Sequence, residues 1–311
     1  MFIGNPGCTY EVFKDVVEQC TNLETLVLSG KYKTIESCGI KEGTMIHMVL
    51  RLRGGKPVIL FYPPSEGPHA KSKAFNVSTS VTLNPACRFT TLMPRPEMSI
   101  EGNNITWNGI VDGHTECDSN GSSLISVDGR KHGYLFWEFT GDDRTDDKDI
   151  VKKSIGVQSI VEHAENAYIL NGIEEYEEWC HVMLGKIGLN PREQDDFATF
   201  WARSVYECGP IVIARVVPEC ELCKCAKLEV KARSDEDSEE VEVDIHRVYV
   251  SMVVSRRVPD DFSRVFDKLQ FWKDVKSEDV GIPTEVRDIY PIHRDAKHMT
   301  VIEWGGIVIT L

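Results

Sequence analysis

The sequence lacks any run of about 18 consecutive apolar residues, so no segment is expected to cross a membrane as a helix. Its start lacks the basic segment and apolar core of a secretory signal. Basic residues are outnumbered by acidic ones: the chain has 35 lysines and arginines and 49 aspartates and glutamates, which gives a net charge of −14. Nucleic acids and anionic membranes bind basic surfaces, so we expect neither as a partner. These absences predict a cytoplasmic protein, with the nucleus as the alternative.

Recognisable catalytic motifs are also missing. The sequence has no glycine-rich phosphate loop, no serine nucleophile elbow and no His-Glu-x-x-His. Cys180 and His181 are adjacent in a predicted helix, where neighbours point about 100° apart, so they cannot pair with each other. No spacing favours a catalytic role for the remaining acid–base candidates, which are Glu138, Glu162-His163 and Asp195-Asp196. We therefore predict no catalytic residue.

The composition is that of a folded chain. It has 311 residues, of which 41% are hydrophobic and 27% charged, enough for a substantial core and about two domains. Ten cysteines without a secretory signal are expected to be mostly reduced thiols.

A domain boundary is predicted near residue 55. Residues 1–55 hold six basic and six acidic groups, so the rest of the chain carries the whole acidic excess. The sequence Gly54-Gly55-Lys56-Pro57 has the backbone freedom of two glycines followed by the extended geometry that proline imposes on its predecessor. We expect one domain over 1–55 and a second over 56–311.

Periodicity predicts an α+β fold. In the first domain it indicates a helix over 10–19 and strands over 23–29 and 44–52. In the second domain β-branched and aromatic segments predict strands over 57–62, 75–83, 88–93, 104–110, 133–140, 211–217, 226–232, 241–255 and 299–311. Helices are expected over 173–189, 191–208 and 262–275, with a loop over 141–153. The second domain is therefore predicted to be β-rich, with a helical segment near 173–208.

The first domain contains three segments, residues 26–31, 34–40 and 44–55, of which the last closes with Leu-Arg-Leu-Arg-Gly-Gly. These segments, and above all the closing sequence, resemble ubiquitin. Two residues without side chains allow an enzyme to enclose the backbone in a narrow tunnel, and the arginines can contact acidic groups outside it. The resemblance implies a processing or recognition tail made of Leu50, Arg51, Leu52, Arg53, Gly54 and Gly55.

Further residues take their expected roles from this resemblance. Val27, His47 and Val49 fall where ubiquitin has its hydrophobic protein-binding patch, and Lys31 and Lys41 match linkage lysines. Receptors or proteases of the ubiquitin pathway are the implied partners. The sequence departs from ubiquitin because only eight residues precede the first helix, too few for an opening hairpin, so the module is expected to be a partial β-grasp. A distant strand of the chain, or a second copy in a homo-oligomer, would have to complete its sheet.

Parts of the second domain resemble motifs of uncharacterised microbial and fungal proteins. These parts are residues 56–64, 105–108, 134–138 and 195–201, and the resemblance implies no activity. Their tryptophans and other aromatics are expected in the core.

One metal site is suggested by Cys220-Glu-Leu-Cys223-Lys-Cys225. Thiolates two or three residues apart can reach one ion in a turn, and sulfur suits zinc or copper(I), with Cys208 or His246 as a fourth ligand. The alternative is a hairpin with three reduced cysteines and no cofactor.

Together these features predict a ubiquitin-like-domain protein that acts as a protein-interaction or processable fusion protein of the ubiquitin pathway. The alternative is a hydrolase or metal-dependent enzyme in residues 56–311, with the ubiquitin-like module as its regulator.

Overall fold

The structure is a computed structural model, which describes the placement of part of the chain. The described residues are 26–28, 31–33, 53–54, 57–99, 102–113, 122–141, 149–236, 238–275, 280–283, 286 and 290–310. The chain divides into two compact units, residues 1–51 and 52–311. In the first unit, β1 (Leu26–Leu28) and β2 (Lys31–Lys33) pair antiparallel. The helix predicted over 10–19 and the strand predicted over 44–52 lie outside the described residues.

The second unit contains a nine-stranded sheet in the order β17-β12-β13-β16-β18-β4-β11-β6, in which β3 also pairs with β18. Its two longest strands, β16 (Val243–Ser255) and β18 (Met299–Thr310), run parallel side by side in its middle. The other strands are β3 (Arg53–Gly54), β4 (Val58–Tyr62), β6 (Cys87–Met93), β11 (Leu135–Gly141), β12 (Ala167–Asn171), β13 (Ile211–Val217) and β17 (Gln270–Phe271).

A second, seven-stranded sheet has the order β10-β9-β8-β5-β14-β15, with β7 beside β8. Along β5 (Ala74–Leu83) one side is buried and the other more accessible, the pattern of a strand with one face on a core. The other strands are β7 (Glu97–Met98), β8 (Asn104–Asp112), β9 (Ile125–Val127), β10 (Arg130–His132), β14 (Ala226–Ser234) and β15 (Glu240–Val241).

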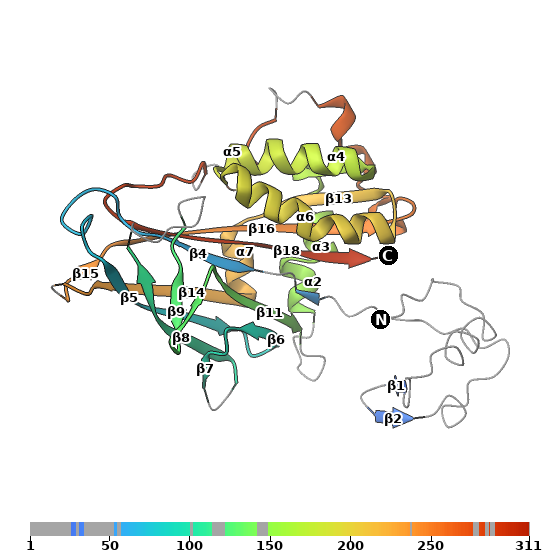
Figure 1. Cartoon of the computed structure of the whole chain (residues 1–311). Coiled ribbons are helices and arrows are strands. Elements are labelled where there is room, and N and C mark those ends of the chain that lie inside the picture. Colours follow the sequence, from blue (N-terminus) through green and yellow to red (C-terminus); the bar gives the residue numbers. More distant parts are fainter. Residues whose placement is uncertain are drawn as a thin grey trace. The chain divides into compact units, whose positions relative to one another are not determined.

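Helices cover one face of the nine-stranded sheet (Figure 1). They are α4 (Gly172–Trp179), which continues through a π-helical segment, Cys180–Leu184, into α5 (Gly185–Ile187), and α6 (Pro191–Cys208). The start of α6 is fixed locally, because Asn190 and Glu193 form a reciprocal capping box and Pro191 occupies the first turn. Apolar side chains from these helices and the sheet form one hydrophobic core.

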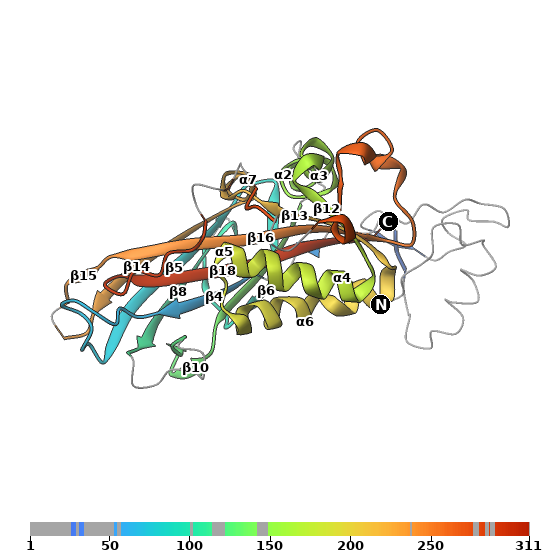
Figure 2. The same cartoon turned by 90° about the horizontal axis from the view of Figure 1, so that it is seen from above.

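A second hydrophobic core lies on the opposite side of the nine-stranded sheet and includes side chains of the seven-stranded sheet. Three short helices, α2 (Ile150–Ser154), α3 (Val157–Glu162) and α7 (Glu219–Cys225), contribute side chains to it. Viewed from above, α7 lies near α2 and α3 (Figure 2).

The predicted α+β class is confirmed for the second unit, which is strand-rich with two sheets and a few helices. The ranges predicted for α6 and β13 are also confirmed. The helix predicted over 262–275 is wrong, since Gln270 and Phe271 pair with β12 as a strand and only short 3₁₀ turns surround them. The loop predicted over 141–153 is wrong at its end, where α2 begins at Ile150. In the part of the chain that is described, no helix is both long and apolar enough to cross a membrane.

Candidate functional site

The predicted tail reaches the nine-stranded sheet. Arg53 and Gly54 form β3 and pair antiparallel with Val308 and Ile307 of β18. Four residues further along, Val58 of β4 pairs with Trp304 of the same strand. The other tail residues, 50–52 and 55, lie outside the described part. At Arg53 and Gly54, therefore, the predicted linker is a paired strand of the second unit.

The residues predicted to bind proteins or carry linkages are described only in part. Val27 is the middle residue of β1 and pairs with Tyr32, while Lys31 begins β2 opposite Leu28. The other three, His47, Val49 and Lys41, lie outside the described residues.

The three predicted metal-binding cysteines lie on α7 rather than in a turn. Cys220 and Cys223 are exposed, whereas Cys225 is fully buried in the core between the sheets. Among the described residues, no group of three or more His, Cys, Asp or Glu is placed to hold a metal ion. His246 lies on β16, and the side chain of Cys208 is outside the described part. Zinc at these thiols stays a prediction.

Next to α7 is a buried ion pair that sequence reasoning missed. Arg247 Nε donates to Glu303 Oε2 at 2.6 Å, and both side chains are at most 2% exposed. The other carboxylate oxygen of Glu303 accepts from Trp137 Nε1 at 2.9 Å. Arg247 Nη1 donates to the carbonyl of Ala226 at 2.9 Å and lies 3.7 Å from Cys223 Sγ. Burial alone would lower the pKa of Arg247, but the carboxylate of Glu303 holds that pKa above its ordinary value.

A second buried ion pair joins α7 to β13. Arg215 donates through both terminal nitrogens to the carboxylate of Glu221, at 2.9 and 3.0 Å, and Ser159 donates to the same carboxylate at 2.8 Å. His163 Nε2 lies 3.5 Å from Glu221 Oε1. Burial alone would raise the pKa of Glu221, but these hydrogen bonds and charges outweigh it, so the pKa is lowered. Ser159 donates to an acid and is not set up as a nucleophile, which makes this arrangement structural.

The lowered pKa of Glu221 predicts a pH-dependent stability. An unfolded glutamate has a pKa of about 4.3, so the stabilisation by Glu221 is complete above that pH and declines as the pH falls toward the lower folded-state pKa. We expect Glu221→Gln to be less stable than the original chain at neutral pH, with the difference shrinking below about pH 4. Urea unfolding measured across this range tests the prediction, and a pH-independent difference would contradict it.

A third polar cluster fixes the start of α6. Tyr62 donates to Glu193 Oε1 at 2.5 Å, and Arg294 Nη2 donates to Glu193 Oε2 at 2.6 Å. The guanidinium of Arg294 also lies 4.4 Å from the centre of the Tyr62 ring. Burial and the neighbouring carboxylate raise the pKa of Tyr62. Tyr62 and Arg294 both donate to Glu193, so the cluster joins the end of β4 to α6.

The structure brings two of the catalytic candidates from the sequence, His181 and Asp195, close to each other. Cys180 is fully buried, and burial raises the pKa of its thiol. His181 Nδ1 lies 3.3 Å from Gln194 Oε1, and its Nε2 lies 3.7 Å from Asp195. Asp196 lies 3.6 Å from Arg192, Glu162 accepts from Gln158 on its own helix, and Glu138 lies on β11. The side chains of His181 and Asp195 are 40% and 67% exposed, which is typical of a surface contact rather than of a catalytic pair in a cleft.

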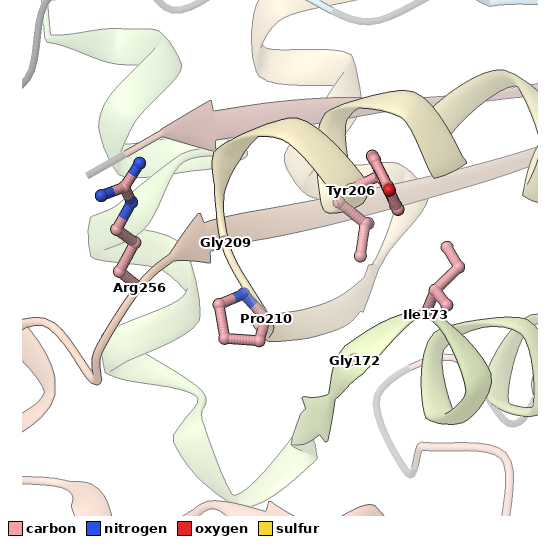
Figure 3. A pocket seen from close by; sticks show the side chains of 7 residues that line it. Gly172, Ile173, Tyr206, Gly209, Pro210 and Arg256 are labelled. Atoms are coloured by element: carbon pink, nitrogen blue, oxygen red, sulfur yellow. The ribbon is translucent and has the colours of Figure 1, made fainter.

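Two open depressions mark the surface of the second unit. One, of about 480 Å³, lies beside the C-terminal end of α6 and includes Ile173, Tyr206 and Arg256 (Figure 3). Tyr206 is 84% exposed, and in Figure 3 Arg256 lies on the other side of Pro210 from it. The other, of about 610 Å³, lies on the outer side of the seven-stranded sheet and is lined mainly by polar and charged side chains. Neither collects a set of groups typical of catalysis.

The fold and these contacts define a strand-rich α+β protein with two sheets and buried ion pairs around α7. No protein-family model matches the chain, and searches of the curated proteins and of the solved structures return no significant match.

Proposed function

We propose that the chain is a ubiquitin-like-domain protein that acts as a protein-interaction or processable fusion protein of the ubiquitin pathway. The observation that carries this proposal is the sequence Leu-Arg-Leu-Arg-Gly-Gly at residues 50–55, which resembles the tail of ubiquitin. Partners are proteins rather than nucleic acids or membranes, and the net charge of −14 supports this choice. A cytoplasmic location is part of the same proposal.

The pairing of β3 favours a module that remains attached. Arg53 and Gly54 form part of the nine-stranded sheet, where their strand pairs with β18. A protease that encloses this backbone must first separate it from β18, which adds the free energy of a local opening to the barrier for cleavage. Recognition of the module by receptors needs no such opening. Receptor binding by the attached module is therefore the role that we favour. Cleavage after the tail is the second role, and we expect it to be slow.

Receptor binding by the intact chain is the test of this function. We expect the full chain to bind an immobilised ubiquitin-binding domain through the patch of Val27, His47 and Val49. Val49→Asp should weaken binding by about tenfold or more, because a charge at the centre of an apolar contact is desolvated without a partner. His47→Ala is a milder variant in case the aspartate unfolds the module, and it should weaken binding in the same direction. Calorimetry or surface plasmon resonance gives the affinities.

A matched control is available in the second unit. Ile110 on β8 is apolar and 46% exposed, like a residue of a binding patch, but it lies outside the ubiquitin-like module. Ile110→Asp should leave receptor affinity unchanged. Absence of binding by the original chain, or an equal loss with Ile110→Asp, would refute the proposed role of the module.

A further inference from the structure

We propose that Cys220 and Cys223 form a thiol–disulfide exchange site whose substrates are small disulfides such as oxidised glutathione. This site is independent of the ubiquitin-like module, since both residues lie on α7 in the second unit.

The spacing of the two cysteines on a helix brings them within reach of each other. Both side chains are exposed, and two residues of α7 lie between them. Helical geometry puts their Cα atoms about 5 Å apart, inside the range of about 4.4–6.8 Å found for disulfides. Their Cβ atoms must come closer than the usual 5–6 Å of such a pair, which requires the turn to tighten.

The first turn of α7 already has part of that tighter geometry. The carbonyl of Pro218 accepts from the backbone N–H of Glu221 at 3.0 Å as well as from that of Leu222 at 3.2 Å. The first bond is of the 3₁₀ type, in which side chains three residues apart eclipse each other. That bond joins residues 218 and 221, so the same tightening must extend to the turn between Cys220 and Cys223 when the disulfide closes.

The surroundings give the two thiols different roles. The sulfur of Cys223 lies 3.7 Å from Nη1 of the buried Arg247, which covers part of it. Cys220 has no such contact among the described residues. Because access to the sulfur limits the rate of exchange, we assign Cys220 as the attacking thiol and Cys223 as the resolving thiol. Cys225 is fully buried, which removes it from exchange with a dissolved disulfide.

The reaction is an exchange that balances without a further reagent. The thiolate of Cys220 attacks one sulfur of oxidised glutathione, a mixed disulfide forms, and the first glutathione leaves as a thiolate that takes up a proton. Cys223 then loses its proton and attacks the sulfur of Cys220. The Cys220–Cys223 bond forms, and the second glutathione leaves. The protein dithiol is oxidised by two electrons and one glutathione disulfide is reduced to two thiols.

The test uses the full chain after treatment with a chelator, so that a bound metal cannot occupy the thiols. The protein is equilibrated with reduced and oxidised glutathione, quenched with acid, alkylated and digested with trypsin. Cleavage after Arg215 and Lys224 yields the peptide 216–224, whose only cysteines are Cys220 and Cys223. We expect this peptide to carry no alkyl group and to be lighter by two hydrogens than its dithiol form. Dithiothreitol should restore the mass of the dithiol form. Free thiols at every glutathione ratio, or glutathione adducts without an internal disulfide, would overturn the proposal.

Single variants test the division of roles. In Cys223→Ser the mixed disulfide cannot be resolved, so a glutathione adduct should accumulate on Cys220. In Cys220→Ser the less accessible Cys223 should form its adduct more slowly. Cys225→Ala is the control and should leave the disulfide in peptide 216–224 intact. Faster adduct formation at Cys223 than at Cys220 would contradict the assignment of the attacking thiol.

Discussion

Replacing Glu303 by glutamine should destabilise the protein by about 3–5 kcal/mol, because the charge of Arg247 would remain buried without its counter-charge. The two side chains are joined by a 2.6 Å hydrogen bond and are almost completely buried. The substitution preserves the size of the side chain and its ability to accept from Trp137, but it turns an amide donor toward Arg247 Nε, so it removes both the charge and the hydrogen bond to Arg247. Urea unfolding monitored by tryptophan fluorescence measures the change.

The partner variant separates the loss of a charge pair from a general disturbance of the core. Adding Arg247→Met to Glu303→Gln removes the unpaired charge, so the double variant should be more stable than Glu303→Gln alone. Glu229→Gln is the exposed control, since the Lys227–Glu229 pair is largely open to solvent and contributes little. If Glu303→Gln were no more destabilising than Glu229→Gln, the buried pair would not have the role assigned to it.

Gly306→Ala should destabilise the protein by about 3 kcal/mol, since it places an atom where the sheet leaves no space. A Cβ at this position would lie 2.6 Å from the backbone carbonyl oxygen of Val250, and 3.5 Å from Nε1 of Trp201. Gly306 and Val250 are partners in the parallel pairing of β18 with β16, so relief of the clash must move one of the two central strands. Chemical unfolding and the thermal midpoint both measure the effect.

The control for this substitution is Gly133→Ala. Gly133 is exposed, and no atom would lie within 4 Å of its new Cβ. The stability of the Gly133→Ala protein should therefore differ little from that of the original chain. Equal effects of the two substitutions would mean that the close approach at Gly306 has no energetic consequence.

Local signals in the sequence explain which elements could be predicted. The start of α6 was predictable because Asn190, Pro191 and Glu193 act within a single turn. The strand β13 was predictable from a short apolar run with β-branched residues. By contrast, α2, α3 and α7 have five to seven residues each, too short for a helical period to emerge.

The ion pairs around α7 depend on contacts that no local pattern specifies. Arg247 and Glu303 are 56 residues apart and meet only because β16 and β18 pair in parallel register. The one available signal was a charged residue inside an apolar run, as at Arg215 in β13. Such a residue must be paired when its strand is buried, but the sequence does not identify its partner. The cysteines of α7 were identified as candidates, but only the fold separates the exposed pair from buried Cys225.

The most direct measurement of the central claim, that residues 50–55 form a ubiquitin-like tail, is digestion of the full chain by a ubiquitin C-terminal protease, with a ubiquitin–protein fusion beside it as a control. Because β3 pairs with β18, we expect cleavage after Gly55 to be slower than in the control fusion but complete on prolonged digestion. Gly54→Val should block it, because a branched side chain cannot enter a tunnel that fits two glycines. Mass spectrometry of the fragments locates the cut. A full chain that stays intact after the control fusion is fully cleaved, or cleavage that Gly54→Val does not affect, would contradict a ubiquitin-like tail.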